Sequence, residues 1–240
     1  MVPIMVSRVS SPSTNELRER IQKIEASHRV ARRLISTGFA AFDRLLPDGG
    51  LAGGSLIEWA SPDEGSGAAT LALTVASHLL RNVRRKFVVI DRTGEFYPPA
   101  AARLGIPLER TIVVRPGGEG DACWAWEQSL RCPGVAVTFG WLPSITDRWC
   151  RRLQAGVEVG GGLGFLMGSP GCSSSAGWGV TRIGVNALPR EGTHLGRCVQ
   201  IELARGHRAT SIDLEWDHET SDVPLVPRMG APEAEYLSAG

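Results

Sequence analysis

The sequence predicts an α/β protein in which a mainly parallel sheet has helices on both faces and antiparallel strands at its C-terminal edge. Three observations support this fold class. An apolar strand at 56–59 leads through a turn of small residues into a helix at 68–80. Apolar strands then alternate with helices as far as residue 167, which requires right-handed crossovers and a parallel sheet. After residue 180 the strands alternate apolar and polar residues with a period of two, as half-exposed antiparallel strands do.

Residues 1–33 are expected to precede the core as a flexible tail followed by an amphipathic helix at 15–30. Leu17, Ile21 and Ile24 fall at i, i+4 and i+7, which places them in one narrow apolar stripe, while charged residues cover the other faces. Such a stripe packs either on the protein's own core or on a partner protein.

The turn between the strand at 56–59 and the following helix has the context of a phosphate-binding loop but not its chemistry. Such a loop binds phosphate through backbone N–H groups, a Lys that reaches the β- and γ-phosphates, and a Ser or Thr that holds Mg²⁺. Here Ala68 and Ala69 follow Gly67, and Asp63 and Glu64 add negative charge. We therefore expect a loop that no longer binds phosphate. The residues of this degenerate phosphate loop are Ser61, Gly65, Gly67, Ala68 and Ala69.

The residues before this strand favour a former phosphate loop over an ordinary glycine-rich turn. Residues 36–54 read STGFAAFDRLLPDGGLAGG. This stretch resembles the lead-in of RecA-type recombinases, which runs directly into their first core strand and P-loop. The resemblance implies a RecA-like P-loop core. Recombinases of this type also use an N-terminal helix to bind the neighbouring subunit, which adds weight to a partner-binding role for the stripe of Leu17, Ile21 and Ile24.

The core is expected to span 34–217, with its remaining elements in regular alternation. Strands are expected at 87–91, 111–115, 135–139 and 163–167, and helices at 98–104, 120–131 and 144–159. Asp121 is expected to be the N-cap of the second of these helices. Antiparallel strands are expected at 181–185, 198–203 and 211–216, the last two joined by a hairpin loop at 204–208. The acidic stretch 218–240 is expected to be a disordered tail.

Two further positions lack the groups that support ATP hydrolysis. The strand at 135–139 ends in Gly140 and Trp141, where a P-loop ATPase places the acid that holds the water shell of Mg²⁺. Glu95 stands where some of these enzymes carry a catalytic base, but without a Lys or metal ligand it has nothing to act on. Asp91 is expected to cap the turn after its strand. We expect no catalytic residues, no metal, no bound ATP and no enzymatic activity.

Length and composition limit the classes of protein to which this chain can belong. The 240 residues leave room for one large domain, and the net charge of +1 excludes a strongly basic nucleic-acid binder, although not a local basic patch. The 5 cysteines are odd in number and form no C-x-x-C pair, which indicates free thiols in a reducing compartment. The start of the chain does not read as a signal peptide, and no apolar run is long enough to span a membrane. We expect a cytoplasmic protein.

The helix at 120–131 and the segments after it resemble one particular family of RecA-like proteins. Its sequence, GDACWAWEQSLR, is similar to the "DALWA.EQALR" helix of the ImuA family. Four further segments of this chain resemble segments of the same family. They are GWLP at 140–143, RRLQA at 151–155, GFL at 164–166 and QIELARGH at 200–207. The last of these is poorer in Lys and Arg than its counterpart in the family. The likeness covers 34–208.

Membership of the ImuA family would imply a particular set of partners. These RecA-like accessory proteins are encoded beside an inactive Y-family polymerase relative and an error-prone replicative polymerase. The resemblance therefore implies a non-catalytic adaptor in the DNA damage response and in translesion synthesis (SOS mutagenesis). Its implied partners are a RecA-type recombinase and the two polymerase-like proteins.

Three arginines form the candidate contact with single-stranded DNA. Arg148, Arg151 and Arg152 share one face of the helix at 144–159 and follow the strand end where RecA-type proteins place their first DNA-contacting loop. Trp141 and Trp149 are close enough in sequence to stack bases. A solvated helix face explains the same arginines, so we expect any DNA binding to be weak. For the basic run at 81–86, a solvated helix end is a sufficient explanation.

Two alternative functions stay open. One is a working recombinase-type, DNA-dependent ATPase in DNA repair, which the missing Lys, hydroxyl and acid disfavour. The other is a cell-division inhibitor of the SulA type, which the two helices similar to those of the ImuA family disfavour.

Overall fold

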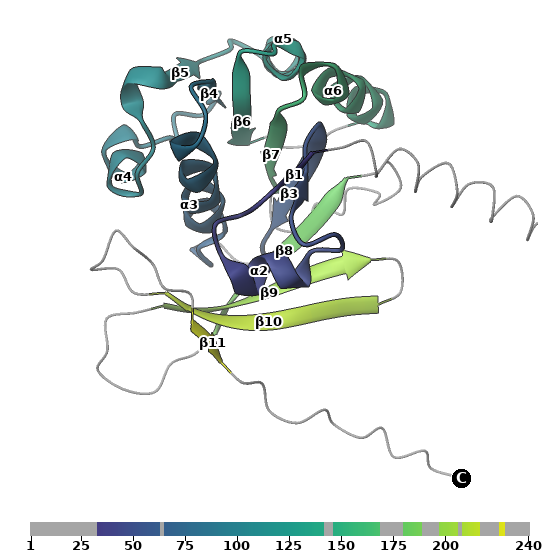
Figure 1. Ribbon diagram of the computed structural model, residues 1–240. Helices are drawn as coiled ribbons and strands as arrows, with labels where there is room; N and C mark the ends of the chain where they lie inside the picture. Colours follow the sequence, from purple (N-terminus) through teal and green to yellow (C-terminus); the bar gives the residue numbers. More distant parts are fainter. Residues whose placement is uncertain are drawn as a thin grey trace, which may run out of the picture. The chain divides into compact units, whose positions relative to one another are not determined.

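A computed structural model describes residues 33–62, 65–141, 146–168, 180–188, 197–205, 208–216 and 226–228. Its main strands are β3 (Ser55–Ala60), β4 (Lys86–Ile90), β5 (Thr111–Val114), β6 (Val135–Trp141), β7 (Leu163–Met167), β8 (Thr181–Leu188), β9 (Arg197–Arg205), β10 (Arg208–Trp216) and β11 (Val226–Arg228). They form one sheet in the order β11-β10-β9-β8-β3-β7-β6-β4-β5 (Figure 1). The neighbours from β8 to β5 are parallel, and β9, β10 and β11 continue the sheet antiparallel. The predicted α/β fold class is confirmed.

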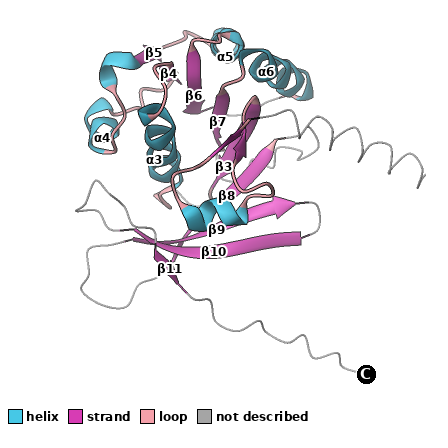
Figure 2. Cartoon of the chain, viewed as in Figure 1, coloured by secondary structure: helices cyan, strands magenta, loops and turns pink. Residues whose placement is uncertain are grey.

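The helices are α2 (Ala40–Leu45), α3 (Ala68–Arg81), α4 (Pro98–Arg103), α5 (Glu119–Arg131) and α6 (Asp147–Gly160), with a 3-10 turn η1 at Leu108–Arg110 (Figure 2). The prediction of Asp121 as an N-cap is wrong. Gly118 is the N-cap of α5, and it makes no side-chain capping bond. Asp121 lies inside the first helical turn, where its carboxylate is favourable to the helix dipole.

The order of the strands places helices on both faces of the sheet. The chain moves outward from β3 to β4 and β5, then returns through β6 and β7, so right-handed crossovers change face at β5. One apolar cluster joins α3 to the sheet through residues such as Trp59, Val75 and Phe139. A second joins α5 and α6 to the other face through Trp126 and Leu153.

Two tryptophans of α5 differ in burial, because residues two apart in a helix point to different faces. Trp126 is fully buried against the sheet, whereas Trp124 is 60% exposed.

The segment that resembles the recombinase lead-in packs against α3. Asp43 of α2 accepts hydrogen bonds from the backbone N–H of Thr37 (2.8 Å), from its hydroxyl (2.7 Å) and from the hydroxyl of Ser36 (2.5 Å). Gly38 has a φ of +91°, and a Cβ there would lie 1.9 Å from Nδ1 of His78 on α3. Only glycine fits both this backbone conformation and this close approach.

The antiparallel end of the sheet differs from the prediction in three details. β8 pairs in parallel with β3 and antiparallel with β9, so the antiparallel part begins one strand later than expected. β9 and β10 continue into the stretch that was predicted as a hairpin loop, with Arg205 paired to Arg208. β11 pairs with β10 and lies within 218–240, where a disordered tail was expected. Period-two patterning identified the strands but could not fix their ends or directions.

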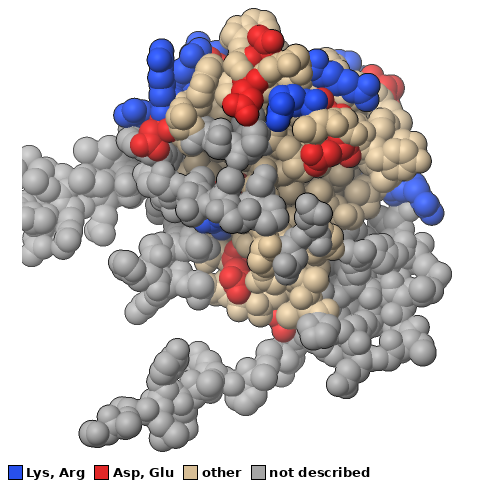
Figure 3. All heavy atoms as spheres, turned by 180° about the vertical axis from the view of Figure 1, so that it is seen from behind, with Lys and Arg blue, Asp and Glu red and all other residues tan. Residues whose placement is uncertain are grey.

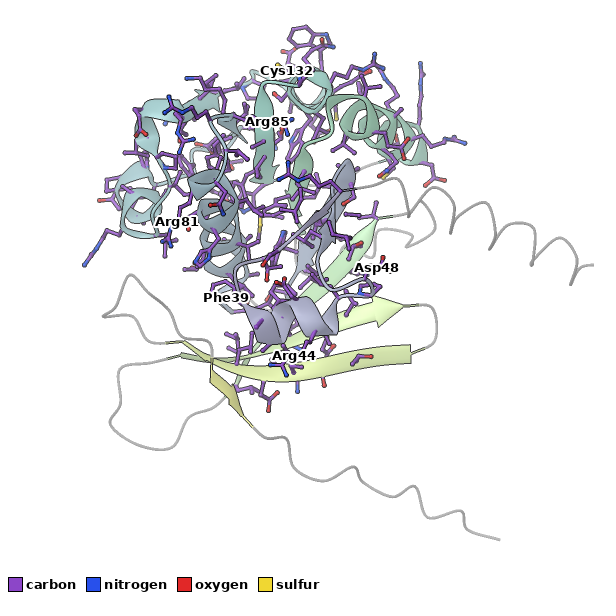
Figure 4. All side chains as sticks on the ribbon, viewed as in Figure 1. Phe39, Arg44, Asp48, Arg81, Arg85 and Cys132 are labelled. Carbon is purple, nitrogen blue, oxygen red and sulfur yellow. The ribbon has the colours of Figure 1, made fainter. Side chains whose placement is uncertain are left out.

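The basic run before β4 does more than end a helix in solvent. Arg85 donates from Nε to the carbonyl oxygen of Pro133 (2.7 Å) and from Nη2 to that of Gly160 (2.9 Å). It therefore joins the start of β6 to the end of α6, and Figure 4 shows it close to Cys132. Burial lowers the pKa of this guanidinium from its ordinary value.

Several predictions from the sequence fall outside the described residues. These are the amphipathic helix with Leu17, Ile21 and Ile24, the acidic residues Asp63 and Glu64, and the ends of the proposed tail. Leu34–Gly240 forms a compact unit separate from Met1–Arg33. Within the described part of the chain, no helix has the length and apolar character needed to cross a bilayer.

Candidate functional site

The degenerate phosphate loop joins the end of β3 to the start of α3. Gly65 and Gly67 both have left-handed backbone conformations, with φ of +80° and +94°. Gly67 is the N-cap of α3 and makes no side-chain capping bond. Because glycine adopts such conformations without steric cost, the local sequence produces the strand, turn and helix expected of a phosphate loop.

Three described side chains at the helix end of this loop, those of Ser66, Ala68 and Ala69, are engaged in packing or in a hydrogen bond within the loop. Ala68, in the position of the phosphate-binding Lys, is buried in the apolar cluster on the α3 face, and Ala69 packs beside it. The buried Ser66 accepts a hydrogen bond from the N–H of Ala68 at 3.3 Å. One backbone donor that would face a phosphate is therefore already used within the loop.

The end of β6 has no room for the acid that a P-loop ATPase needs there. Gly140 pairs with Ile90 of β4. A Cβ at Gly140 would lie 2.3 Å from the carbonyl oxygen of Ile90. Any side chain at this position therefore requires the two strands to separate. The spacing of the strands thus excludes an acid here.

The two acids after β4 have local roles. Asp91 is buried and accepts hydrogen bonds from the N–H groups of Gly94 (2.9 Å) and Glu95 (2.8 Å), which confirms that it caps the turn. Glu95 is exposed and accepts a hydrogen bond from the hydroxyl of Thr93 at 2.6 Å. Its carboxylate is therefore held by the turn itself.

Glu58 is a buried acid of β3 that the sequence analysis did not single out. It faces the side of the sheet covered by α6, and Arg182 of β8 approaches it to 3.5 Å. Burial, and then the carboxylates of Asp147 and Glu58, raise the pKa of the Cys150 thiol on α6. The signal in the sequence was a single acid inside an apolar strand, which indicates a buried ion pair. Among the described residues, no group of three or more His, Cys, Asp or Glu side chains could hold a metal ion.

The three arginines predicted to contact DNA differ in their exposure on α6. Arg148 and Arg151 are exposed on α6. Arg152 instead forms an ion pair with Glu127 of α5, a buried residue that also binds Nη2 of Arg131 at 3.0 Å. The DNA contact of Arg152 stays a prediction, and in this placement its guanidinium joins two helices.

The tryptophans expected to stack bases are also engaged. The guanidinium of Arg152 lies 4.3 Å from the ring centroid of Trp149. Trp141 packs edge-on against Phe139 with ring centroids 5.1 Å apart. A nucleic-acid base could therefore stack only on the parts of these two rings that Arg152 and Phe139 do not cover.

Comparisons with known proteins give relatives of three kinds, while no family model matches the chain. The chain is 30% identical to Protein ImuA of Caulobacter vibrioides over 152 residues, which are 60% of this chain and 61% of that protein. It is 35% identical to the cell division inhibitor SulA of Edwardsiella piscicida over 63 residues, 26% of this chain and 38% of that protein. It is 30% identical to Protein RecA of Rhodopirellula baltica over 117 residues, 49% of this chain and 31% of that protein.

These relatives agree with the fold. The chain resembles ImuA-type, RecA-like proteins, and its core is RecA-like. In each case the chain spans less than two thirds of the relative's length.

Proposed function

We propose that the protein is a non-catalytic RecA-fold adaptor in the DNA damage response, acting in translesion synthesis. The observation that carries this proposal is the degenerate phosphate loop, in which Ala68 and Ala69 replace the phosphate and Mg²⁺ ligands. The close contact of Gly140 with β4 supports it, because this contact excludes the metal-side acid. The likeness to ImuA supplies the cellular setting.

An adaptor of this kind acts through protein partners. In RecA-type filaments the nucleotide sits between subunits, so a core without it is not expected to form an active filament of its own. Surfaces suited to subunit contact can still serve other proteins. The partners that we propose are a RecA-type recombinase, an inactive Y-family polymerase relative and an error-prone replicative polymerase.

The first test of the proposal is nucleotide binding. We expect titration calorimetry with Mg-ATP to give no binding signal, and we expect no ATP hydrolysis with or without DNA. Ala68→Lys combined with Ala69→Thr should not produce turnover, because the metal-side acid is still missing. Adding Gly140→Asp to that pair should destabilise the fold instead of completing the site, since its Cβ meets Ile90. Micromolar affinity of the wild-type chain for Mg-ATP would contradict the proposal.

The second test concerns the N-terminal stripe of Leu17, Ile21 and Ile24. In the helix-in-groove mode, these side chains would each contribute about 1.5–3 kcal/mol before the cost of ordering the helix. Deleting residues 1–30 is therefore expected to abolish capture of purified recombinase or polymerase-like partners. The melting temperature should stay unchanged, because Leu34–Gly240 is a compact unit by itself. A large fall in melting temperature would show that the stripe packs on its own core.

A weak contact with single-stranded DNA is proposed for Arg148 and Arg151. Changing both to Ala should weaken binding at low salt and reduce the dependence of log Kd on log salt by about 1.4, from two phosphates at about 0.7 each. Arg152 stays unchanged in this variant, because its ion pair with Glu127 would confuse loss of binding with loss of stability. Binding that is unaffected by the double change would exclude this face.

A second candidate function, cell-division inhibition, is favoured by one observation. The segment shared with SulA is 35% identical, a higher identity than to ImuA, although it covers only 26% of the chain. Expression in a bacterial host separates the two candidates. Filamentous cells in an otherwise undamaged culture would favour the inhibitor, whereas damage-induced mutagenesis that depends on the chain without filamentation would favour the adaptor.

A further inference from the structure

A polar hollow lies at the C-terminal end of α3, at the other end of this helix from the degenerate phosphate loop. It has a volume of about 610 Å³. The 14 residues of α3 separate the two places by about 20 Å at 1.5 Å per residue. The lining residues are Arg81, Asn82, Val83, Arg84 and Arg110. Three of these five residues are arginines, so the hollow is suited to anions.

Arg110 is fixed in the wall of this hollow by the end of α3. Its Nη2 donates to the carbonyl oxygen of Leu80 at 3.1 Å, and its Nη1 donates to that of Val83. Its Nε lies 3.7 Å from the carboxylate of the exposed Glu109. The positive charge of Arg110 therefore balances the carbonyl groups at the helix end and one nearby acid.

Arg81 and Arg84 have no such partners. Both are exposed, and within the described residues neither forms an ion pair or a hydrogen bond. Nη2 of Arg81 lies beside the turn after α4, 3.4 Å from where a Cβ of Gly105 would be (Arg81 is labelled in Figure 4). Two guanidinium groups that no described carboxylate neutralises thus line one hollow.

The described charges at this hollow are mainly positive. Figure 3 shows a face on which Asp and Glu lie among Lys and Arg. Among the described residues that line the hollow there is no acid, and the nearby Glu109 is paired with Arg110. The charge of Arg81 and Arg84 is thus available to a ligand.

The lining also indicates the class of ligand. Pockets for small apolar molecules are lined mainly by hydrophobic side chains. Here Val83 is the single apolar residue among the described residues of the lining. Guanidinium groups bind phosphate oxygens through paired N–H donors, and phosphate contacts need no apolar anchor.

We propose that Arg81 and Arg84 form a phosphate-binding site for a single-stranded nucleic acid. The site lies apart from the degenerate loop and from Arg148 and Arg151, and it does not depend on the adaptor role. Because it holds backbone phosphates, it binds without base preference.

The test is fluorescence anisotropy of the full chain with a labelled oligo(dT) strand at several salt concentrations. The variant is Arg81→Gln with Arg84→Gln, which removes charge but keeps polarity. The matched control is Arg44→Gln with Arg92→Gln, two exposed arginines at other places on the chain. We expect Kd to rise about tenfold in the variant, the combined effect of two exposed charge pairs, and to stay unchanged in the control. The dependence of log Kd on log salt should fall by about 1.4.

Three results would overturn the proposal. The first is equal loss of binding in the variant and in the control, which would mean a general effect of net charge. The second is competition by polyglutamate as strong as by unlabelled oligo(dT), which would assign the hollow to acidic protein. The third is binding of tripolyphosphate that depends on Arg81 and Arg84 while oligo(dT) does not bind, which would assign it to free phosphate compounds. Thermal melting of each variant confirms that it is folded.

Discussion

Replacing Gly160 by alanine is expected to destabilise the protein by about 3 kcal/mol, the upper end for overpacking. Gly160 is the last residue of α6, and a Cβ there would lie 2.0 Å from the carbonyl oxygen of Leu130 on α5. The two helices must separate to admit the methyl group, which opens the apolar cluster beneath them. The gain of alanine over glycine in helix propensity, about 1 kcal/mol at most, does not offset this.

Gly156 provides the matched control, one helical turn earlier on α6. The nearest atom to a Cβ at Gly156 is 3.4 Å away, and it belongs to the flexible side chain of Arg131. Gly156→Ala is therefore expected to be neutral or stabilising. Chemical denaturation of both variants measures the free energy of unfolding. Equal stability of the two would contradict the close helix contact at Gly160.

Removing both arginines that bind Glu127 is the second change with a large expected effect. Arg131→Ala with Arg152→Ala leaves a buried carboxylate, 6% exposed in its side chain, without an ionic partner. Such a loss costs about 3–5 kcal/mol. Both arginines are about half exposed, so water compensates in part, and we expect a value near 3 kcal/mol.

Two comparison variants identify the cause of that loss. Arg92→Ala with Arg148→Ala removes the same charge from exposed positions and should change the unfolding free energy by less than about 0.5 kcal/mol per site. Adding Glu127→Gln to the Arg131 and Arg152 double variant should recover part of the stability, because a neutral amide is less costly to bury than a charge. No recovery would mean that packing of the arginine stems, and not the carboxylate, causes the loss.

The sequence predicted the elements well because their signals are local. Apolar runs at 87–91 and 163–167 and the helical run at 68–80 need no knowledge of distant residues, and all three elements are present. Ends and caps were less predictable. Gly118 became the N-cap of α5 in place of Asp121 because its extended backbone, and not a side chain, starts the helix.

The candidate site was only partly predictable, for a physical reason. Helical spacing places Arg148, Arg151 and Arg152 on one face, but it cannot reveal that α5 brings Glu127 to the last of them. Likewise, the sequence shows that Gly140 is not an acid, but only the pairing with Ile90 shows that an acid does not fit. Contacts between segments distant in the chain carry this information, and local patterns do not.

The contact of Gly140 with Ile90 also limits how this chain could evolve. Recovering ATP chemistry needs a Lys, a hydroxyl and an acid together, because none of the three is useful without the others. A Lys at 68 or a Thr at 69 would replace a methyl group that packs in the apolar cluster. A side chain at 140 must first push β4 and β6 apart. A single substitution at 140 would therefore cost stability, and none of the three changes is expected to confer activity by itself. For the adaptor that we propose, substitutions are therefore expected to be tolerated more readily on exposed surfaces than at these three positions.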